Sequence, residues 1–124
     1  MSVLVDTPLL LDYLNGDKRA AAALEAYAHR SISVVTWLEL MAACPPDLAD
    51  STRGFLRTFE RLSVSESIAD EALKLMQRKP GLPMSRALTW ASANVNQLSF
   101  LTNDSAGVAS GDANVVVPYR RAKG

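Results

Sequence analysis

A chain of 124 residues in which 48% of the side chains are hydrophobic is long enough to form one globular domain with its own core. Thirteen basic and thirteen acidic residues give a formal net charge of zero, which excludes a uniformly basic nucleic-acid-binding surface and leaves only local patches. The single cysteine, Cys44, cannot form an internal disulfide, which fits a reducing compartment. Because neither a signal-peptide pattern nor a membrane-spanning run is visible, we expect a cytoplasmic protein without a membrane partner.

The first element follows from a short apolar run that ends in a carboxylate. Val3–Val5 predicts a buried strand, Asp6 follows it directly, and Pro8 opens a helical apolar pattern over residues 9–14. Asp6 therefore lies at the carboxyl end of a strand, which is the edge where open α/β sheets bind ligands. The simpler interpretation is that Asp6 or Thr7 only caps the helix.

The remaining chain alternates between strands and helices. Further strands are predicted at 32–35, 62–64, 98–102 and 115–117, and further helices at 17–28, 36–43, 47–60, 66–78 and 86–96. Asp17 and Ser85 are the expected caps of two helices, and Thr36 has the capping-box spacing to Glu39. This alternation predicts one α/β domain over residues 1–119 with a parallel sheet covered on both faces. A glycine-containing loop over 105–114 and a basic tail over 120–124 complete the chain.

Three arginines recur every four residues in the predicted helix 47–60 and just beyond it: Arg53, Arg57 and Arg61. A stripe of this kind is more typical of a solvated helix face than of a contact with RNA, so RNA binding is the minority interpretation.

Three carboxylates each follow a predicted strand or open the helix after one: Asp6, Glu39 and Asp104. In a parallel sheet these positions meet at one edge. A helix cap explains each acid separately, but it does not explain their convergence. Clustered carboxylates repel unless a cation neutralises them, and oxygen ligands suit Mg²⁺ or Mn²⁺.

This layout resembles the PIN-domain family, and within it the VapC-like toxins of toxin–antitoxin pairs. The segments that carry the resemblance span most of the chain: 3–7 with 11–14, 32–40, 82–93, 98–104 and 117–119. The resemblance implies a PIN-like three-layer α/β/α sandwich with a central, mainly parallel sheet. It also implies an antitoxin partner and four acidic positions that hold one or two divalent metals for cleavage of RNA.

The acidic positions implied by the resemblance are only partly present. Asp6 matches the first, Glu39 the second and Asp104 the fourth, which makes these three the expected catalytic and metal-binding residues. Arg86 stands where the third acid is expected, and Pro8 replaces a small polar residue. Because this change places a cation in a site meant for a metal, we expect the Arg86 guanidinium to lie among the three carboxylates.

Three hypotheses follow. The first and favoured one is a catalytically impaired or inactive relative that keeps the scaffold for partner binding and needs no metal. The second is an active Mg²⁺- or Mn²⁺-dependent endoribonuclease that works with three acids. The third is an unrelated α/β domain whose acids are only helix caps. We also expect a homodimer, because Trp37, Leu38, Met41 and Trp90 supply more large apolar surface than one small core needs.

Overall fold

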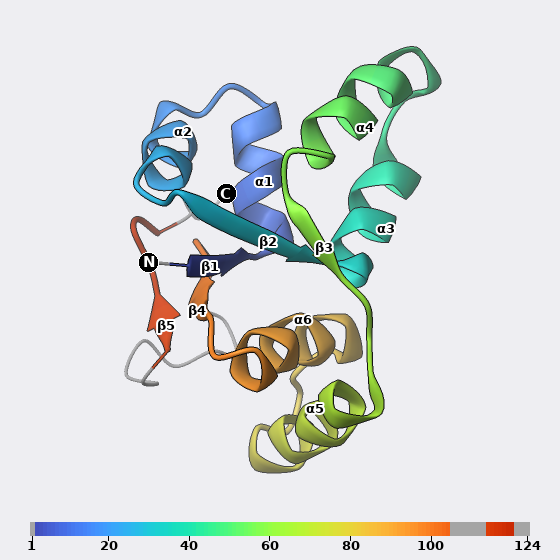
Figure 1. Ribbon diagram of the computed structural model, residues 1–124, viewed down its shortest axis with the longest axis vertical. Helices are drawn as coiled ribbons and strands as arrows, with labels where there is room; N and C mark the ends of the chain where they lie inside the picture. The colour runs from blue at the N-terminus through green and yellow to red at the C-terminus, as the bar shows by residue number, and fades with distance from the viewer. Residues whose placement is uncertain (1, 105–113, 121–124) are drawn as a thin grey trace.

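The computed structural model describes residues 2–104 and 114–120 and contains a five-stranded parallel sheet (Figure 1). The strands are β1 (Ser2–Val5), β2 (His29–Ser33), β3 (Glu60–Leu62), β4 (Ser99–Leu101) and β5 (Val115–Val116). Their order across the sheet is β3-β2-β1-β4-β5, and all four neighbouring pairs are parallel. The first strand is therefore the central one, and every connection between neighbouring strands is a crossover.

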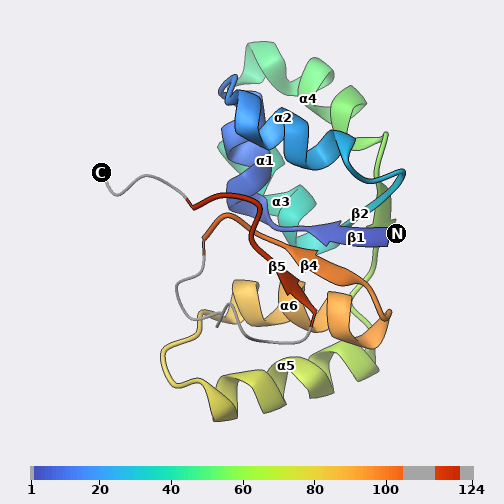
Figure 2. The ribbon, with the colours of Figure 1, turned by 90° about the vertical axis from the view of Figure 1, so that its left-hand side faces the viewer.

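Helices cover both faces of this sheet. They are α1 (Thr7–Leu14), α2 (Lys18–Glu25), α3 (Val34–Ala43), α4 (Ala49–Leu56), α5 (Glu66–Arg78) and α6 (Met84–Val95), with a 3₁₀ turn η1 (Pro46–Leu48) before α4. The first four helices lie on one face, and α5 and α6 lie on the other (Figures 1 and 2). The prediction of a three-layer sandwich with a parallel sheet is confirmed. Within the described ranges, each helix is too short or too polar to span a bilayer.

The central strand divides the core in two, because successive side chains of a strand point to opposite faces. Val3 and Val5 pack under α1 to α4, whereas Leu4 packs with Phe100 and Trp90 under α5 and α6. Val3, Leu4 and Val5 are fully buried, and each such burial stabilises the fold by about 1.5–3 kcal/mol. Trp90 is only 2% exposed and stacks on Phe100, with ring centroids 6.2 Å apart. It therefore supplies no surface for a dimer, contrary to the expectation from sequence.

Several predicted boundaries were wrong by a few residues. The second strand ends at Ser33, whose hydroxyl accepts the Val35 N–H, so Ser33 caps α3 in place of the predicted Thr36 capping box. The helix predicted over 47–60 ends at Leu56, which places Arg61 on β3, and the strand predicted at 62–64 is β3 at 60–62.

The other predicted caps had mixed outcomes. Helix α6 begins at Met84 after Pro83, so Ser85 lies inside the helix and does not cap it. The caps at Asp6 and Asp17 are confirmed. Most of the loop predicted over 105–114, and all but the first residue of the tail over 120–124, lie outside the described residues.

The register of the sheet fixes the site. Val5 pairs with Leu101 across β1 and β4, and the Asp6 N–H extends the ladder by donating to the Leu101 carbonyl at 2.9 Å. Thr102 likewise donates its N–H to the Val116 carbonyl of β5 at 3.0 Å. The residues that follow β1 and β4 are therefore held side by side at the carboxyl edge of the sheet.

Candidate functional site

Asp6 lies at the centre of the carboxyl edge and is almost completely buried, with 3% of its surface exposed. As the N-cap of α1, its Oδ1 accepts the Thr7 N–H at 2.9 Å. Its Oδ2 accepts the Thr102 hydroxyl at 2.8 Å and an N–H from Arg86 Nη2 at 2.7 Å. The capping interpretation is therefore correct for Oδ1, while Oδ2 has different partners at the carboxyl edge of the sheet.

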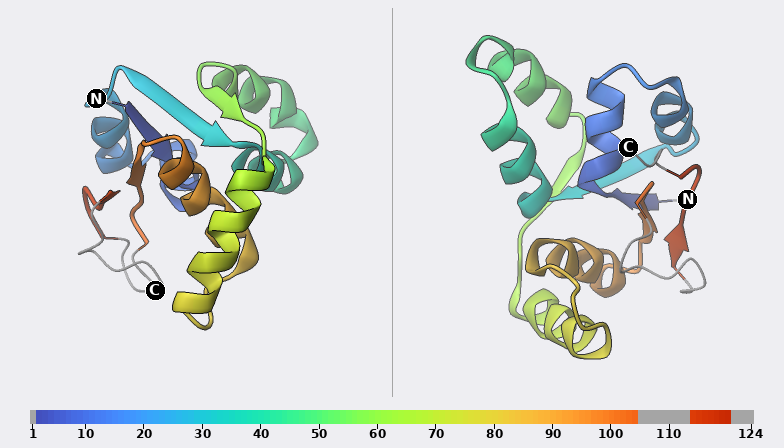
Figure 3. Two further views of the ribbon diagram at one scale, coloured as in Figure 1. Left: turned by 60° about the horizontal axis from the view of Figure 1, so that its bottom comes forward. Right: turned by 180° about the vertical axis from the view of Figure 1, so that it is seen from behind.

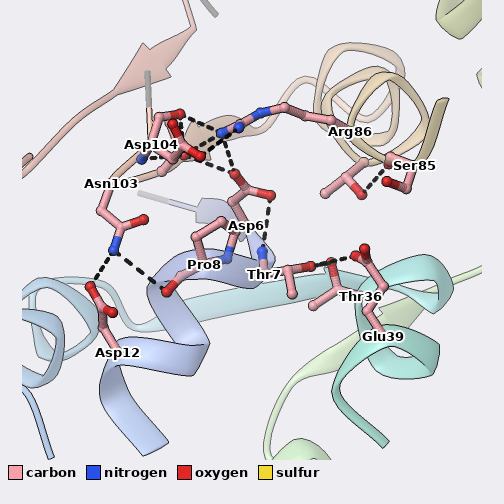
Figure 4. Close-up of polar contacts among 12 residues, drawn as sticks. Asp6, Thr7, Pro8, Asp12, Thr36, Glu39, Ser85, Arg86, Asn103 and Asp104 are labelled. Atoms are coloured by element: carbon pink, nitrogen blue, oxygen red, sulfur yellow. Dashed lines mark hydrogen bonds and ion pairs between the residues drawn. The ribbon is translucent and has the colours of Figure 1, made fainter. Parts of the chain in front are cut away.

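Arg86 extends from the first turn of α6 into the space between Asp6 and Asp104 (Figure 4). Its Nη2 contacts Asp6 Oδ2, the Thr102 hydroxyl at 2.9 Å and the Asp104 carbonyl, while Nη1 lies 3.2 Å from Asp104 Oδ2. Only 12% of the Arg86 side chain is exposed, against 36% for Asp104. The guanidinium thus joins the two carboxylates that follow β1 and β4.

Glu39 belongs to the same edge but is not joined to the guanidinium. It lies on the exposed side of α3, and its Oε1 accepts the Thr7 hydroxyl at 2.8 Å. The Thr7 hydroxyl oxygen also lies 2.9 Å from that of Thr36. Figure 4 shows Glu39 beside these two threonines and apart from the Arg86 head group. The guanidinium therefore pairs with two of the three expected acids, and Glu39 reaches Asp6 only through Thr7.

A cleft of about 270 Å³ opens between the acids and the start of α6. It is lined by Asp6, Thr7, Pro8, Leu11, Glu39, Pro83, Ser85, Arg86 and Thr89. The Arg86 Nε in its wall is buried and has no acceptor among the described residues.

Burial raises the pKa of Asp6, because removing a carboxylate from water disfavours its charged form. The Arg86 charge and the hydrogen bonds from Thr102 and Thr7 lower this pKa, and the nearby Glu39 raises it. The net direction is upward, so the cation beside Asp6 offsets only part of the cost of burying the charge.

A second polar cluster, which could not be predicted from the sequence, ties the C-terminal half of α1 to the residues that follow β4 and β5. Asn103 donates from Nδ2 to Asp12 Oδ2 at 2.5 Å, and the Tyr119 hydroxyl donates to the same oxygen at 3.0 Å. Burial raises the pKa of Tyr119 to about 12, and its hydrogen bond to Asp12 acts in the same direction. Arg19 lies over the Tyr119 ring, 4.4 Å from its centroid. This cluster anchors the residue that precedes Asp104.

The side chains at this edge do not fit a divalent metal in the arrangement observed. Within residues 2–104 and 114–120, no three Asp, Glu, His or Cys side chains are grouped closely enough to hold one. The guanidinium lies between Asp6 and Asp104, so a cation bound by both acids would lie against a fixed positive charge.

The fold and this edge define a three-layer α/β protein whose polar site lies at the carboxyl ends of parallel strands. The PIN-domain sequence profile matches residues 3–107, so the chain belongs to the PIN-domain family. A search of the curated proteins found no match.

Solved structures share this fold. A toxin–antitoxin complex from Klebsiella pneumoniae contains a chain 32% identical to this one, with a TM-score of 0.90, over 97% of this chain and 100% of that one. FitAcB from Neisseria gonorrhoeae is 18% identical with a TM-score of 0.75, and covers 94% of this chain and 97% of its own. DNA-bound VapBC from Salmonella typhimurium is also 18% identical with a TM-score of 0.75, over 95% and 98% of the two chains. The last two likenesses concern the fold alone.

Proposed function

We propose that this chain is the VapC-like member of a toxin–antitoxin pair whose acidic site is partly neutralised by its own arginine and is catalytically impaired. The observation that carries the proposal is the Arg86 guanidinium bound between Asp6 and Asp104. A tethered cation has no binding equilibrium with the solvent, so one of the two negative charges remains compensated at any metal concentration. The scaffold stays folded without metal and is available to a partner.

Electrostatics and chemistry both disfavour a metal beside this arginine. Two unit charges 4 Å apart interact by roughly 4 kcal/mol at an effective dielectric near 20, and a divalent ion doubles that repulsion. A guanidinium also cannot replace the metal, because it does not lower the pKa of a bound water as a divalent ion does. Asp6 and Asp104 therefore serve as anchors for Arg86 and not as metal ligands.

The likeness to the Klebsiella pneumoniae chain supports the partner in this proposal. That chain was solved in a toxin–antitoxin complex, and the present chain matches its full length at 32% identity. A cognate antitoxin is accordingly the expected partner.

The second candidate function is an active Mg²⁺- or Mn²⁺-dependent endoribonuclease that uses Asp6, Glu39 and Asp104. It is favoured by Glu39, which is exposed and makes no contact with the guanidinium, and by the partial exposure of Asp104. In this alternative the Arg86 side chain leaves the edge before a metal binds.

Thermal unfolding with Mn²⁺ and with EDTA separates the two candidates. The variants are Arg86→Asp and Arg78→Asp, the latter a matched charge reversal at an exposed position of α5. We expect no metal-dependent shift in Tm for the wild type or Arg78→Asp, and a clear stabilisation of Arg86→Asp by Mn²⁺. Cleavage of a single-stranded RNA should appear only with Arg86→Asp. A wild type that Mn²⁺ stabilises and that cleaves RNA would overturn the proposal in favour of the active enzyme.

A further inference from the structure

Helices α3 and α4 and strand β3 lie next to one another (Figure 3). Side chains from these elements line a second concave site, away from the acids. It is a depression of about 420 Å³, which we call the arginine pocket, and it is lined by Trp37, Arg53, Leu56, Arg57, Phe59 and Arg61. Arg53 lies on α4, Arg57 caps its end and Arg61 lies on β3. The three arginines thus come from a helix and the strand that follows it and converge on one pocket, which a solvated helix face does not require.

The charges of these arginines are not neutralised within the described part of the chain. None of the three guanidinium groups lies within 4 Å of a carboxylate there. All three side chains are exposed, in a protein whose formal net charge is zero. Uncompensated positive charge concentrated in a concave surface attracts anions.

Aromatic rings hold the guanidinium groups in place. The Cζ atom of Arg61 lies 4.7 Å from the centroid of the Trp37 ring, and that of Arg53 lies 5.8 Å from it. Arg30 on β2 stacks in the same way over Phe59, at 5.2 Å. Stacking uses the flat face of a guanidinium and leaves its N–H groups at the rim free to bind a phosphate through two hydrogen bonds.

We propose that the arginine pocket binds the phosphodiester backbone of single-stranded nucleic acid, independently of the acidic edge. Arg53 and Arg57 are one helical turn apart, roughly 5–6 Å, so they can contact neighbouring phosphates of one strand. Trp37 is only half-buried, and its ring keeps the Arg53 and Arg61 head groups at the pocket while their N–H groups bind the phosphates.

An acidic peptide is the competing ligand, and the spacing of the charges favours the nucleic acid. A single strand carries one phosphate at every nucleotide of one backbone, so neighbouring phosphates can contact Arg53 and Arg57 together. Neighbouring carboxylates of an extended peptide point to opposite sides of its backbone.

The test measures binding of a fluorescein-labelled single-stranded RNA, and of DNA of the same sequence, by anisotropy in EDTA at several salt concentrations. EDTA keeps the result independent of any metal-dependent cleavage at the acidic edge. The variants are Arg53→Gln with Arg57→Gln, and the control Lys74→Gln with Arg78→Gln. The control removes two exposed charges of the same spacing from α5, on the opposite face of the sheet. Far-UV circular dichroism verifies that both double variants fold.

We expect Kd to rise about tenfold in the pocket variant and to change less than twofold in the control. The salt dependence, as the slope of log K against log salt, should fall by about 1.4 in the pocket variant, or about 0.7 for each phosphate that an arginine no longer neutralises. Nucleic acid should also quench the emission of Trp37, since Trp90 is buried. Equal weakening in both double variants, or no binding of either polymer, would overturn the proposal. So would polyglutamate that binds more tightly than RNA and loses affinity in the pocket variant.

Discussion

Replacing Arg86 with methionine should leave a carboxylate buried without its cation. Arg86 Nη2 lies 2.7 Å from Asp6 Oδ2, and opposite unit charges at that distance attract by roughly 6 kcal/mol at an effective dielectric near 20. Desolvation of both groups offsets much of this attraction, and removing one partner of a buried pair costs about 3–5 kcal/mol. Asp6 keeps its bonds from Thr7 and Thr102, so we expect a loss of about 3 kcal/mol near pH 7. The pair with Asp104 adds little, because that carboxylate is more than one third exposed.

The same variant should respond to acid in a defined direction. The folded-state pKa of Asp6 already lies above its ordinary value, so its contribution to stability is present at low pH and is lost as pH rises through that pKa. Loss of the Arg86 charge raises this pKa further, because that charge lowers it in the wild type. The destabilisation of Arg86→Met should therefore shrink as the pH is lowered and Asp6 takes up a proton.

Urea denaturation followed by circular dichroism, at about pH 7 and about pH 5, measures both effects. Arg78→Met, which removes an exposed arginine from α5, should change stability by less than about 0.5 kcal/mol at either pH. A penalty for Arg86→Met below about 1 kcal/mol, or one that does not change with pH, would show that the guanidinium does not hold the Asp6 charge.

Other predictions concern the neighbours of this pair and the surface. Thr102→Val removes a hydrogen bond that lowers the pKa of Asp6, so the carboxyl carbon of Asp6 should titrate at higher pH by NMR, with a stability loss of about 1–2 kcal/mol. One of the three tyrosines should titrate near pH 12 by ultraviolet absorbance, and Tyr119→Phe should remove that transition. Because the pKa of Tyr119 is raised, its contribution to stability is present below its ordinary pKa and is lost as pH rises through about 12. Leu38 is 55% exposed on α3, so we predict a homodimer by light scattering at high micromolar concentration and a monomer for Leu38→Asp; a monomeric wild type would contradict this.

The meeting of Asp6, Asp104 and Arg86 could be predicted because it follows from topology. Parallel strands bring their carboxyl ends to one edge, and α6 begins at the same edge. The placement of Glu39 could not be predicted, because it depends on the rotation of α3 about its axis. Ser33 ends β2 and caps α3, which turns Thr36 inward to meet Thr7 and leaves Glu39 bonded to the Thr7 hydroxyl.

The arginine pocket could not be predicted from the sequence, because α4 ends at Leu56, before the end that the sequence predicts. A repeat of every fourth residue places Arg53, Arg57 and Arg61 on one helix face, and sequence periodicity alone does not show where that helix ends. In the structure the Thr58 hydroxyl bonds the Phe55 carbonyl at 2.7 Å after the last turn of α4, and the chain then enters β3. The cluster of Asp12, Asn103 and Tyr119 could not be predicted either. The two partners of Asp12 lie 91 and 107 residues away in the sequence, so they form no local pattern.

The central position of the first strand has a consequence for synthesis of the chain. The β1 strand needs β4 on one side, and Asp6 meets Thr102, 96 residues later, only when that pairing forms. A ribosome adds roughly 5–20 residues per second, so β4 is synthesised about 5–20 s after β1. During that interval the nascent chain carries an unpaired hydrophobic strand, which is prone to aggregate or to recruit a chaperone. The carboxyl edge is therefore among the last parts of the molecule to form, and a chain truncated before β4 cannot form it.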